Sequence, residues 1–260
     1  MQYIDIHGHY AWGIDDGMPN KDDARKALEL AKQQGVDTIV ATPHVVPGQH
    51  QEKDLLDLKE RIKDLKELAL SYGIEILEGC ELFLNYECID ALDSKIYIPI
   101  ENTHYLLCEF DVRKQLGREN EVEDFLYEIE MQKLVPVIAH VERYFKDGID
   151  LERVKEFVES GYVIQVNASS LLGVHGKKVM ANAYALIDNG LAHVVASDTH
   201  RCDGQRCPRF KETFDVLSKK YDYEVVRKLM YDNPLHIIEN EDVEDIEVKK
   251  SFFKKLFKRR

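Results

Sequence analysis

Residues 1–9, Met1-Gln-Tyr-Ile-Asp-Ile-His-Gly-His9, form a short apolar strand pattern that ends at Gly8. Side chains two apart on a strand point to the same side, so Asp5, His7 and His9 are expected to converge on one centre. Two imidazoles beside a carboxylate suit a divalent transition metal. A histidine pair near a chain start could also be a purification remnant, but this stretch is not the homopolymeric run of a tag. A motif this short needs support from the rest of the chain.

Similar segments recur along the chain of 260 residues and mostly alternate with helical patterns. Seven strand candidates lie at residues 1–9, 36–44, 74–81, 104–110, 135–140, 162–167 and 192–200. Their apolar character and the intervening helices predict a parallel α/β sheet. Six of the seven end in His, Asp or Glu. A β/α barrel brings all strand ends to one rim, whereas an open doubly wound sheet joins only those near its switch point. We therefore predict an α/β fold, a distorted seven-stranded (β/α)7 TIM-like barrel.

The helical patterns between these strands set the expected domain limits. Asn20 is predicted to cap a first helix that ends at Gly35, and a long charged helix should cover about residues 51–72. Two helices, about residues 208–220 and 223–232, are expected to finish the folded part before Asn233-Pro234. We predict one barrel over residues 1–238 and a tail over residues 239–260.

Composition excludes several classes of protein. No apolar stretch reaches the length of a membrane span and no basic-then-apolar leader is present, so a cytoplasmic location is expected. Five cysteines without a C-x-x-C pair argue against a disulfide framework, and none has an arginine six positions later, as a cysteine phosphatase would need. A net charge of −13 disfavours nucleic acid as the main partner.

The predicted rim gathers carboxylates and imidazoles. Its members would be His7, His9, Asp16, His44, Glu81, Glu109, His140, Asp198 and His200. A lone histidine at a strand end is more often structural, but nine such groups together would repel or stay unsatisfied without cations. They exceed what one ion can use, so two or three metals are expected.

Other residues of these types lack such placement. We expect structural or surface roles for His50, His104, His175, His193 and His236. Cys80 and Cys108 precede rim residues, so they should face the opposite side of their strands and pack under helices. Cys202 and Cys207 are expected to be loop thiols.

The motifs "D-I-H-G-H", "D-D-G", "A-T-P-H", "G-C-E", "C-E-F", "A-H-V-E-R-Y", "N-A-S-S-L-L-G" and "S-D-T-H" occur in this order over residues 1 to about 235. Together they resemble the PHP (polymerase and histidinol phosphatase) superfamily. Within it, the chain is similar to the metal-dependent protein-tyrosine phosphatases of bacterial capsule and exopolysaccharide loci, the CpsB/CapC type. Two departures leave the ligands intact: Gly8 and Val141 stand where the family often has Ser and Pro.

The resemblance implies a seven-stranded barrel with three divalent metal ions, usually Mn²⁺, with Fe or Zn as alternatives. Carried over by position, the metal ligands would be His7, His9, His44, Glu81, Glu109, His140, Asp198 and His200. The resemblance also implies phosphate binding by Arg143 and by an arginine after His200. We favour Arg206 over Arg201 for the second, because Arg206 precedes Cys-Pro. Asp16 corresponds to a further site aspartate.

The mechanism expected from this site is hydrolysis of a phosphate monoester. A water bridging two metals would lose a proton near neutral pH and attack phosphorus in line, while Arg143 and the metals stabilise the spreading charge. Asp16 or a metal-bound water could act as acid. An ion pair with Glu142 is the structural alternative for Arg143. Tyr10, Trp12 and Phe145 could flank an aromatic substrate ring or pack the loops.

The last residues form a separate electrostatic unit. Residues 249–260 carry seven cations and no acid, and Phe252, Phe253, Leu256 and Phe257 form one apolar helical stripe. Such a helix suits an anionic membrane surface or an acidic partner, or could fold back on the acidic barrel. The resemblance implies a membrane-associated bacterial tyrosine kinase as substrate, with the phosphatase at the inner membrane surface. Alternatives are a small-molecule phosphatase such as histidinol phosphatase, and a metal-stabilised regulatory domain without turnover.

Overall fold

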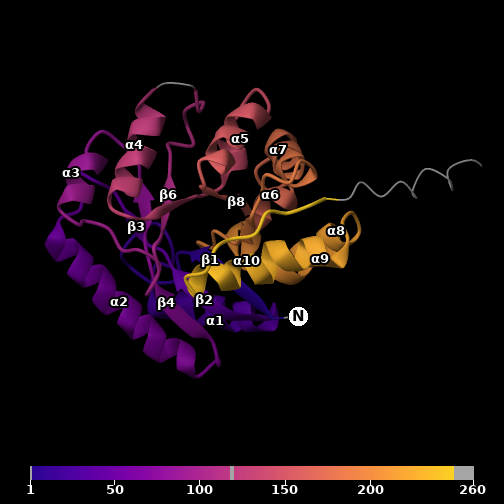
Figure 1. Ribbon diagram of the computed structural model, residues 1–260. Coiled ribbons are helices and arrows are strands. Elements are labelled where there is room, and N and C mark those ends of the chain that lie inside the picture. The colour runs from indigo at the N-terminus through magenta and orange to yellow at the C-terminus, as the bar shows by residue number, and fades with distance from the viewer. Residues whose placement is uncertain (1, 118–119, 249–260) are drawn as a thin grey trace, which may run out of the picture.

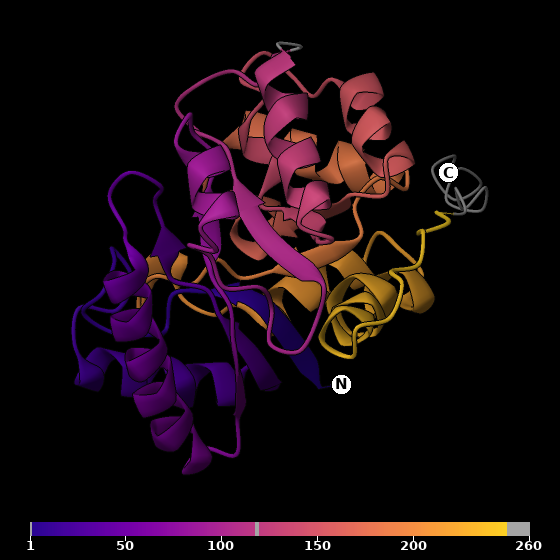
Figure 2. The same cartoon turned by 60° about the vertical axis from the view of Figure 1, so that its left-hand side comes forward.

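The computed structural model describes residues 2–117 and 120–248. Its strands are parallel and lie inside a layer of helices (Figure 1; Figure 2). The strands are β1 (Tyr3–Gly8), β2 (Val36–Ala41), β3 (His44–Val45), β4 (Glu75–Glu78), β5 (Glu81–Phe83), β6 (Tyr105–Glu109), β7 (Val135–Ile138), β8 (Val163–Asn167) and β9 (Val194–Ala196). Their outer helices are α1 (Lys21–Gln33), α2 (Glu52–Leu70), α3 (Cys88–Asp93), α4 (Asn120–Met131), α5 (Leu151–Glu159), α6 (Ala168–Leu171), α7 (Lys177–Asp188), α8 (Phe210–Ser218), α9 (Tyr223–Arg227) and α10 (Asn233–Ile238).

The strands follow one another around a ring in the order β1-β2-β4 and then β3-β5-β6-β7-β8-β9. β3 continues β2 beyond Thr42 and Pro43, and β5 continues β4 beyond Gly79 and Cys80, which reduces the nine segments to the seven predicted strand positions. Proline has no N–H for the ladder, which explains the break at Pro43. At the far end, the His9 N–H donates to the Thr199 carbonyl at 2.8 Å and brings β9 back beside β1. The predicted parallel seven-stranded α/β architecture is confirmed.

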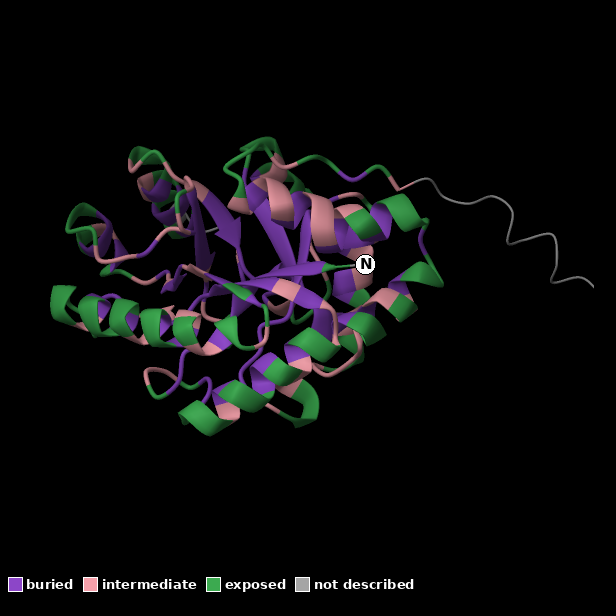
Figure 3. Cartoon of the chain, turned by 90° about the horizontal axis from the view of Figure 1, so that it is seen from below, coloured by how far each residue is buried: buried purple, intermediate pink, exposed green. Residues whose placement is uncertain are grey.

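Two apolar layers hold this architecture together. One lies inside the ring and includes Ile4, Leu107, Val137 and Val194, while a larger one lies between strands and helices. Figure 3 shows the strands buried and the outward faces of the helices exposed. Ile237 of α10 belongs to the inner cluster, so α10 contributes to the core of the ring. Residues buried on both faces are what a parallel sheet covered by helices requires.

Side-chain caps mark the starts of α1 and α5. Asn20 caps α1 by accepting a hydrogen bond from the Asp23 N–H at 3.0 Å, as predicted. Asp150 caps α5 in the same way through the Arg153 N–H. Within the described residues, no helix combines the length and apolar character needed to span a membrane.

The prediction that the folded part ends before Asn233-Pro234 is wrong. The chain continues from α9 through a π-helical segment, Lys228–Asp232, into α10. Pro234 lies at the start of α10, directly after the π-helical segment, to which it can donate no backbone hydrogen bond. The Asn233 amide then binds the backbone of Glu244, and Ile246 is buried. Residues 239–248, which we had assigned to the tail, therefore pack against the body.

Candidate metal centre and phosphate site

The predicted site residues meet in one cavity at the C-terminal ends of the strands. The cavity has a volume of about 230 Å³ and is lined by Asp16, His44, Glu81, Glu109, His140, Arg143, Asp198, His200 and Arg206, with Phe83, Asp111, Val112 and Arg113. His7 and His9 lie beneath it and are fully buried. Strand ends share one rim in a parallel barrel, which is why residues distant in sequence meet there.

Among the described residues, three groups of side chains have ligand atoms within 4.8 Å of one another: His9, Asp16, His44 and His200; His7, His9 and Asp198; and His44, Glu81 and Glu109. His140 lies beside them, with its Nε2 atom 3.0 Å from Glu81 Oε1 and 3.5 Å from Glu109 Oε2. The structure thus brings together all eight predicted ligands and Asp16.

Two polar side chains behind the site orient His7 and His9. The His9 Nδ1 atom lies 2.7 Å from Asp15 Oδ2, and the His7 Nδ1 atom lies 3.0 Å from Gln165 Oε1. Gln165 Oε1 also accepts the His140 N–H, so this oxygen must be the acceptor for His7 as well. In their neutral, metal-binding form both histidines therefore carry their proton on Nδ1, and their Nε2 atoms lie only 3.4 Å apart. This is the arrangement of metal-ligating imidazoles with their supporting groups.

The same supporting network reaches Asp198. Gln165 Nε2 donates to Asn167 Oδ1 at 2.8 Å, and Asn167 Nδ2 donates to Asp198 Oδ2 at 2.8 Å. Gln165 and Asn167 are fully buried on β8. Sequence reasoning missed Asp15 and Gln165 as functional residues. Asp15 sits beside Asp16 in the quoted "D-D-G" motif, whereas nothing in the local sequence distinguishes Gln165.

The electrostatics of the cluster indicate that cations belong in it. Burial by itself lowers the pKa of His7, but the carboxylates of Glu81 and Asp198 raise it to about 9. Burial likewise opposes the charge on His44, while Glu81 and Asp16 raise its pKa to about 10. Burial and the neighbouring Glu81 charge raise the pKa of Glu109 to about 8. Without metal ions, protons on His7, His44 and Glu109 balance the charge of the neighbouring carboxylates. Bound divalent cations would balance that charge instead.

Unpartnered atoms support the same conclusion. The Nδ1 atom of His140 is buried without a hydrogen-bond partner, and that of His44 makes no hydrogen bond although it lies 3.2 Å from Glu81 Oε2 and 3.3 Å from Glu109 Oε1. His140 and Asp198 also have left-handed backbones, with φ of 35° and 52°. Non-glycine residues adopt this conformation at a cost, which is typical of functional sites. The imidazole and carboxylate side chains of this site are therefore suitable ligands for divalent metal ions.

The arginines divide into two kinds. Arg143 Nη1 lies 3.3 Å from Asp198 Oδ2, and Arg206 Nη2 lies 3.5 Å from Asp198 Oδ1. Both line the cavity and stay partly exposed. Arg201 instead donates to the backbone carbonyls of Gly17 and His200. Arg143 contacts Asp198 across the cavity. The contrast between Arg206 and Arg201 supports Arg206 as the second phosphate-binding residue.

Asp16 occupies an exposed edge of the cluster, with Oδ1 3.3 Å from Nε2 of both His44 and His200. Hydrogen bonds from His200 and His44 hold the pKa of Asp16 well below its usual range. A carboxylate without a proton at neutral pH favours the role of a metal ligand over that of an acid.

Other expectations need correction. Asp5 does not join His7 and His9, because the β1 register shifts between Asp5 and Gly8 and breaks the alternation. Its carboxylate accepts hydrogen bonds from Ser197 Oγ at 2.6 Å and Ser197 N at 2.9 Å. The suggestion that aromatic residues flank the substrate ring also fails for Tyr10, Trp12 and Phe145, which are all buried and outside the cavity lining.

The remaining histidines and cysteines lie outside the described metal groups, namely His50, His104, His175, His193, His236, Cys202 and Cys207. Cys80 and Cys108 are buried, and burial raises the pKa of the Cys80 thiol to about 12. They pack in the core as predicted.

Comparison with known proteins identifies the family. The tyrosine-protein phosphatase CpsB of Streptococcus pneumoniae is 29% identical over 242 residues, which cover 90% of this chain and 98% of that protein. CpsB of Streptococcus agalactiae serotype III is 28% identical over 244 residues, 91% of this chain and 98% of that protein. A solved structure described with YwqE from Bacillus subtilis and CpsB from Streptococcus pneumoniae as metal-dependent tyrosine phosphatases superposes with a TM-score of 0.83. It is 27% identical and covers 95% of this chain and 98% of that one. A family model for capsular polysaccharide synthesis, CpsB/CapC, matches residues 3–239, and the chain therefore belongs to the CpsB/CapC family.

Proposed function

We propose that this chain is a metal-dependent protein-tyrosine phosphatase of capsule or exopolysaccharide synthesis. The observation that carries the proposal is the cavity in which carboxylates and imidazoles face the guanidinium groups of Arg143 and Arg206. The tyrosine-phosphatase names of the relatives support phosphotyrosine as the substrate class. Family membership supports the link to capsule synthesis.

The metal ligands in this proposal are His7, His9, His44, Glu81, Glu109, His140, Asp198 and His200, joined by Asp16. Three divalent ions are proposed, one for each group of ligand atoms; the resemblance to the CpsB/CapC type favours Mn²⁺, with Fe or Zn as alternatives. When bound, such ions activate water as a nucleophile and neutralise phosphate charge. Gln165 and Asp15 hold His7 and His9 in the tautomer that leaves Nε2 free.

The chain's own cations bind the phosphate group. Arg143 and Arg206 approach Asp198 from the open side of the cavity, where they can reach phosphate oxygens. A planar guanidinium donates two parallel hydrogen bonds to such oxygens and stabilises charge that develops on them. A tyrosine leaving group has a pKa of about 10, so phenolate departs with less protonation than an alkoxide would need.

The proposed partner is a phosphotyrosine protein, in particular a membrane-associated bacterial tyrosine kinase, with the enzyme acting in the cytoplasm. The division into a barrel of residues 1–238 and a tail of residues 239–260 remains a prediction, and the first part of that tail, residues 239–248, packs against the body. Residues 249–260 lie outside the described part of the chain, and their proposed contact with an anionic membrane or acidic partner is likewise a prediction. Deletion of residues 249–260 should weaken liposome binding while turnover of a small substrate stays intact; unchanged binding would remove this idea.

The decisive experiment compares a phosphotyrosine peptide with histidinol phosphate after chelation and readdition of Mn²⁺. Phosphate release from the peptide should depend on Mn²⁺ and should be lost in His44→Ala. Preference for histidinol phosphate would mean that the substrate is a small phosphate ester and not a phosphotyrosine protein. No phosphate release from either compound would favour a regulatory domain without turnover.

A further inference from the structure

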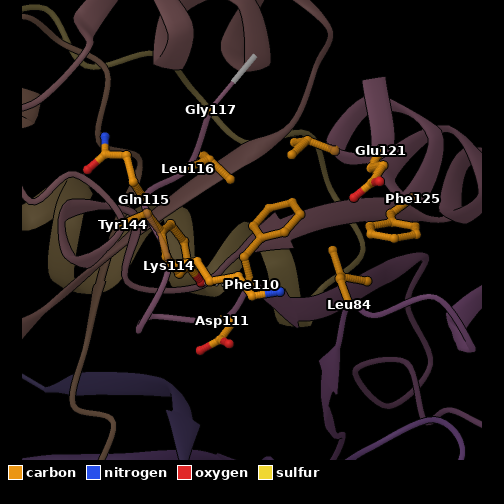
Figure 4. A pocket seen from close by; sticks show the side chains of 11 residues that line it. Leu84, Phe110, Asp111, Lys114, Gln115, Leu116, Gly117, Glu121, Phe125 and Tyr144 are labelled. Atoms are coloured by element: carbon orange, nitrogen blue, oxygen red, sulfur yellow. Dashed lines mark hydrogen bonds between the residues drawn. The ribbon is translucent and has the colours of Figure 1, made fainter. Parts of the chain in front are cut away.

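A second cavity lies beside the metal centre and has no role in the chemistry proposed above. Its volume is about 290 Å³, and it lies between residues 110–117 and α4. Six apolar or aromatic side chains line it: Leu84, Phe110, Leu116, Val122, Phe125 and Tyr144. Figure 4 shows the Phe110 and Phe125 rings and Leu84 facing a common space, with Asp111 at the edge. We call this cavity the apolar groove.

The apolar groove and the metal cavity share a wall. Asp111 lines both cavities, and Phe110 directly follows the proposed ligand Glu109. The Phe110 N–H donates to the Tyr144 hydroxyl at 3.0 Å, and the Tyr144 ring packs 5.6 Å from the His140 ring. A molecule bound at the metals would therefore have the groove as its immediate neighbour.

Charges of both signs lie along this wall, since Glu121 and Lys114 line the groove and Asp111 and Arg113 line the metal cavity. Arg113 is 83% exposed and neutralises Asp111 through a contact of 2.8 Å, and it lines the metal cavity. Lys114 is exposed and lines the groove. These cations lie at the mouth of the site in a protein whose net charge is −13. A phosphorylated peptide crossing from one cavity to the other would pass these two cations, which can pair with its acidic groups.

We propose that the apolar groove binds a large apolar side chain of the substrate polypeptide, close in sequence to the phosphotyrosine. This inference rests on the proposed phosphotyrosine activity. Alternate side chains of an extended peptide point to the same side, with an advance of about 3.3 Å per residue. Because the two cavities share Asp111, the selected residue is expected within about three positions of the phosphotyrosine. At about 290 Å³ the groove has room for one large side chain.

The test is a set of phosphotyrosine peptides that carry Phe or Gly at each of the three positions on either side of the phosphotyrosine. Assays use the manganese-loaded full chain, with p-nitrophenyl phosphate as a substrate that reaches only the metal cavity. One Phe peptide should show a kcat/KM about tenfold above its Gly counterpart. Phe125→Ala should abolish that preference and leave p-nitrophenyl phosphate turnover unchanged.

Two further variants separate recognition from folding. Phe125→Leu keeps most of the packing and should retain part of the preference, with thermal unfolding as the check on stability. Tyr127→Ala is the matched control, since Tyr127 lies on the same helix, is 55% exposed and does not line the groove. It should keep the full preference.

Three outcomes would overturn the inference. Equal turnover of all Phe and Gly peptides, with p-nitrophenyl phosphate still hydrolysed, would show that the groove binds no substrate side chain. The proposed function would be unaffected by that result. An equal loss on all substrates in Phe125→Ala and Phe125→Leu would assign Phe125 to structure alone. No hydrolysis of any phosphotyrosine compound would reject the proposed function and this inference with it.

Discussion

Asp15 supports His9 from behind the metal site, and its removal should weaken metal binding without touching a proposed ligand. Asp15 Oδ2 lies 2.7 Å from His9 Nδ1 and accepts the His44 N–H at 3.2 Å. Asp15 Oδ1 accepts the Gly17 N–H at 2.8 Å. Burial raises the pKa of Asp15, but the interactions with His9, the Gly17 N–H and His44 together outweigh it and lower the pKa to about 2. Asp15 is therefore an acceptor on both oxygens at neutral pH.

Asparagine at this position has only one acceptor oxygen. If that oxygen faces His9, the amide nitrogen meets the Gly17 N–H donor; if it faces Gly17, His9 loses its acceptor. Loss of such a supporting contact typically costs about 10- to 100-fold in metal affinity. We expect about tenfold for Asp15→Asn and about 100-fold for Asp15→Ala, or about 1.4 and 2.7 kcal/mol.

Calorimetric titration of metal-free protein with Mn²⁺ measures these affinities directly. Phosphatase activity as a function of Mn²⁺ concentration should shift by the same factor and recover at saturation. Asp22→Asn is the matched control, because Asp22 is 72% exposed and pairs with Arg25 away from the site. Unchanged Mn²⁺ affinity in both Asp15 variants would refute the assignment of Asp15 as the group that orients His9.

Further predictions concern phosphate binding, pH and packing. Arg143→Lys keeps the charge but loses the planar fork, so kcat/KM on phosphotyrosine should fall about 100-fold, whereas Arg201→Lys should nearly preserve it; steady-state kinetics checks both. His193 is buried and accepts a backbone N–H at Nδ1, and burial lowers its pKa. The unfolded chain thus binds the extra proton, so the free energy of unfolding should fall as pH drops below about 6.5. Urea unfolding from pH 8 to 5 should show this slope, and an equal slope in His193→Asn would contradict it. Gly8→Ala places a Cβ 2.4 Å from the Tyr10 ring and should cost about 1–3 kcal/mol in thermal unfolding, which Tyr10→Leu should partly restore.

Patterns local in the sequence were sufficient to predict the architecture and to select the proposed metal ligands, which the structure brings together. Apolar strands that alternate with helices predicted a parallel barrel, and the endings of those strands predicted a crowded rim. The motifs predicted the CpsB/CapC family, which is confirmed. These predictions succeed because strand order, helix periodicity and the common rim all follow from the strand–helix alternation that is visible in the sequence.

Only the tertiary structure decided how the site residues are oriented. The register shift in β1 turns Asp5 toward Ser197, although strict alternation predicted a place beside His7. The contact between Gln165 and His7 joins residues 158 positions apart, and the choice between Arg206 and Arg201 depends on which guanidinium a loop directs into the cavity. Sequence periodicity specifies which face a residue occupies. Hydrogen-bond partners across the barrel depend on register, loop geometry and packing, which are fixed only when the whole ring closes.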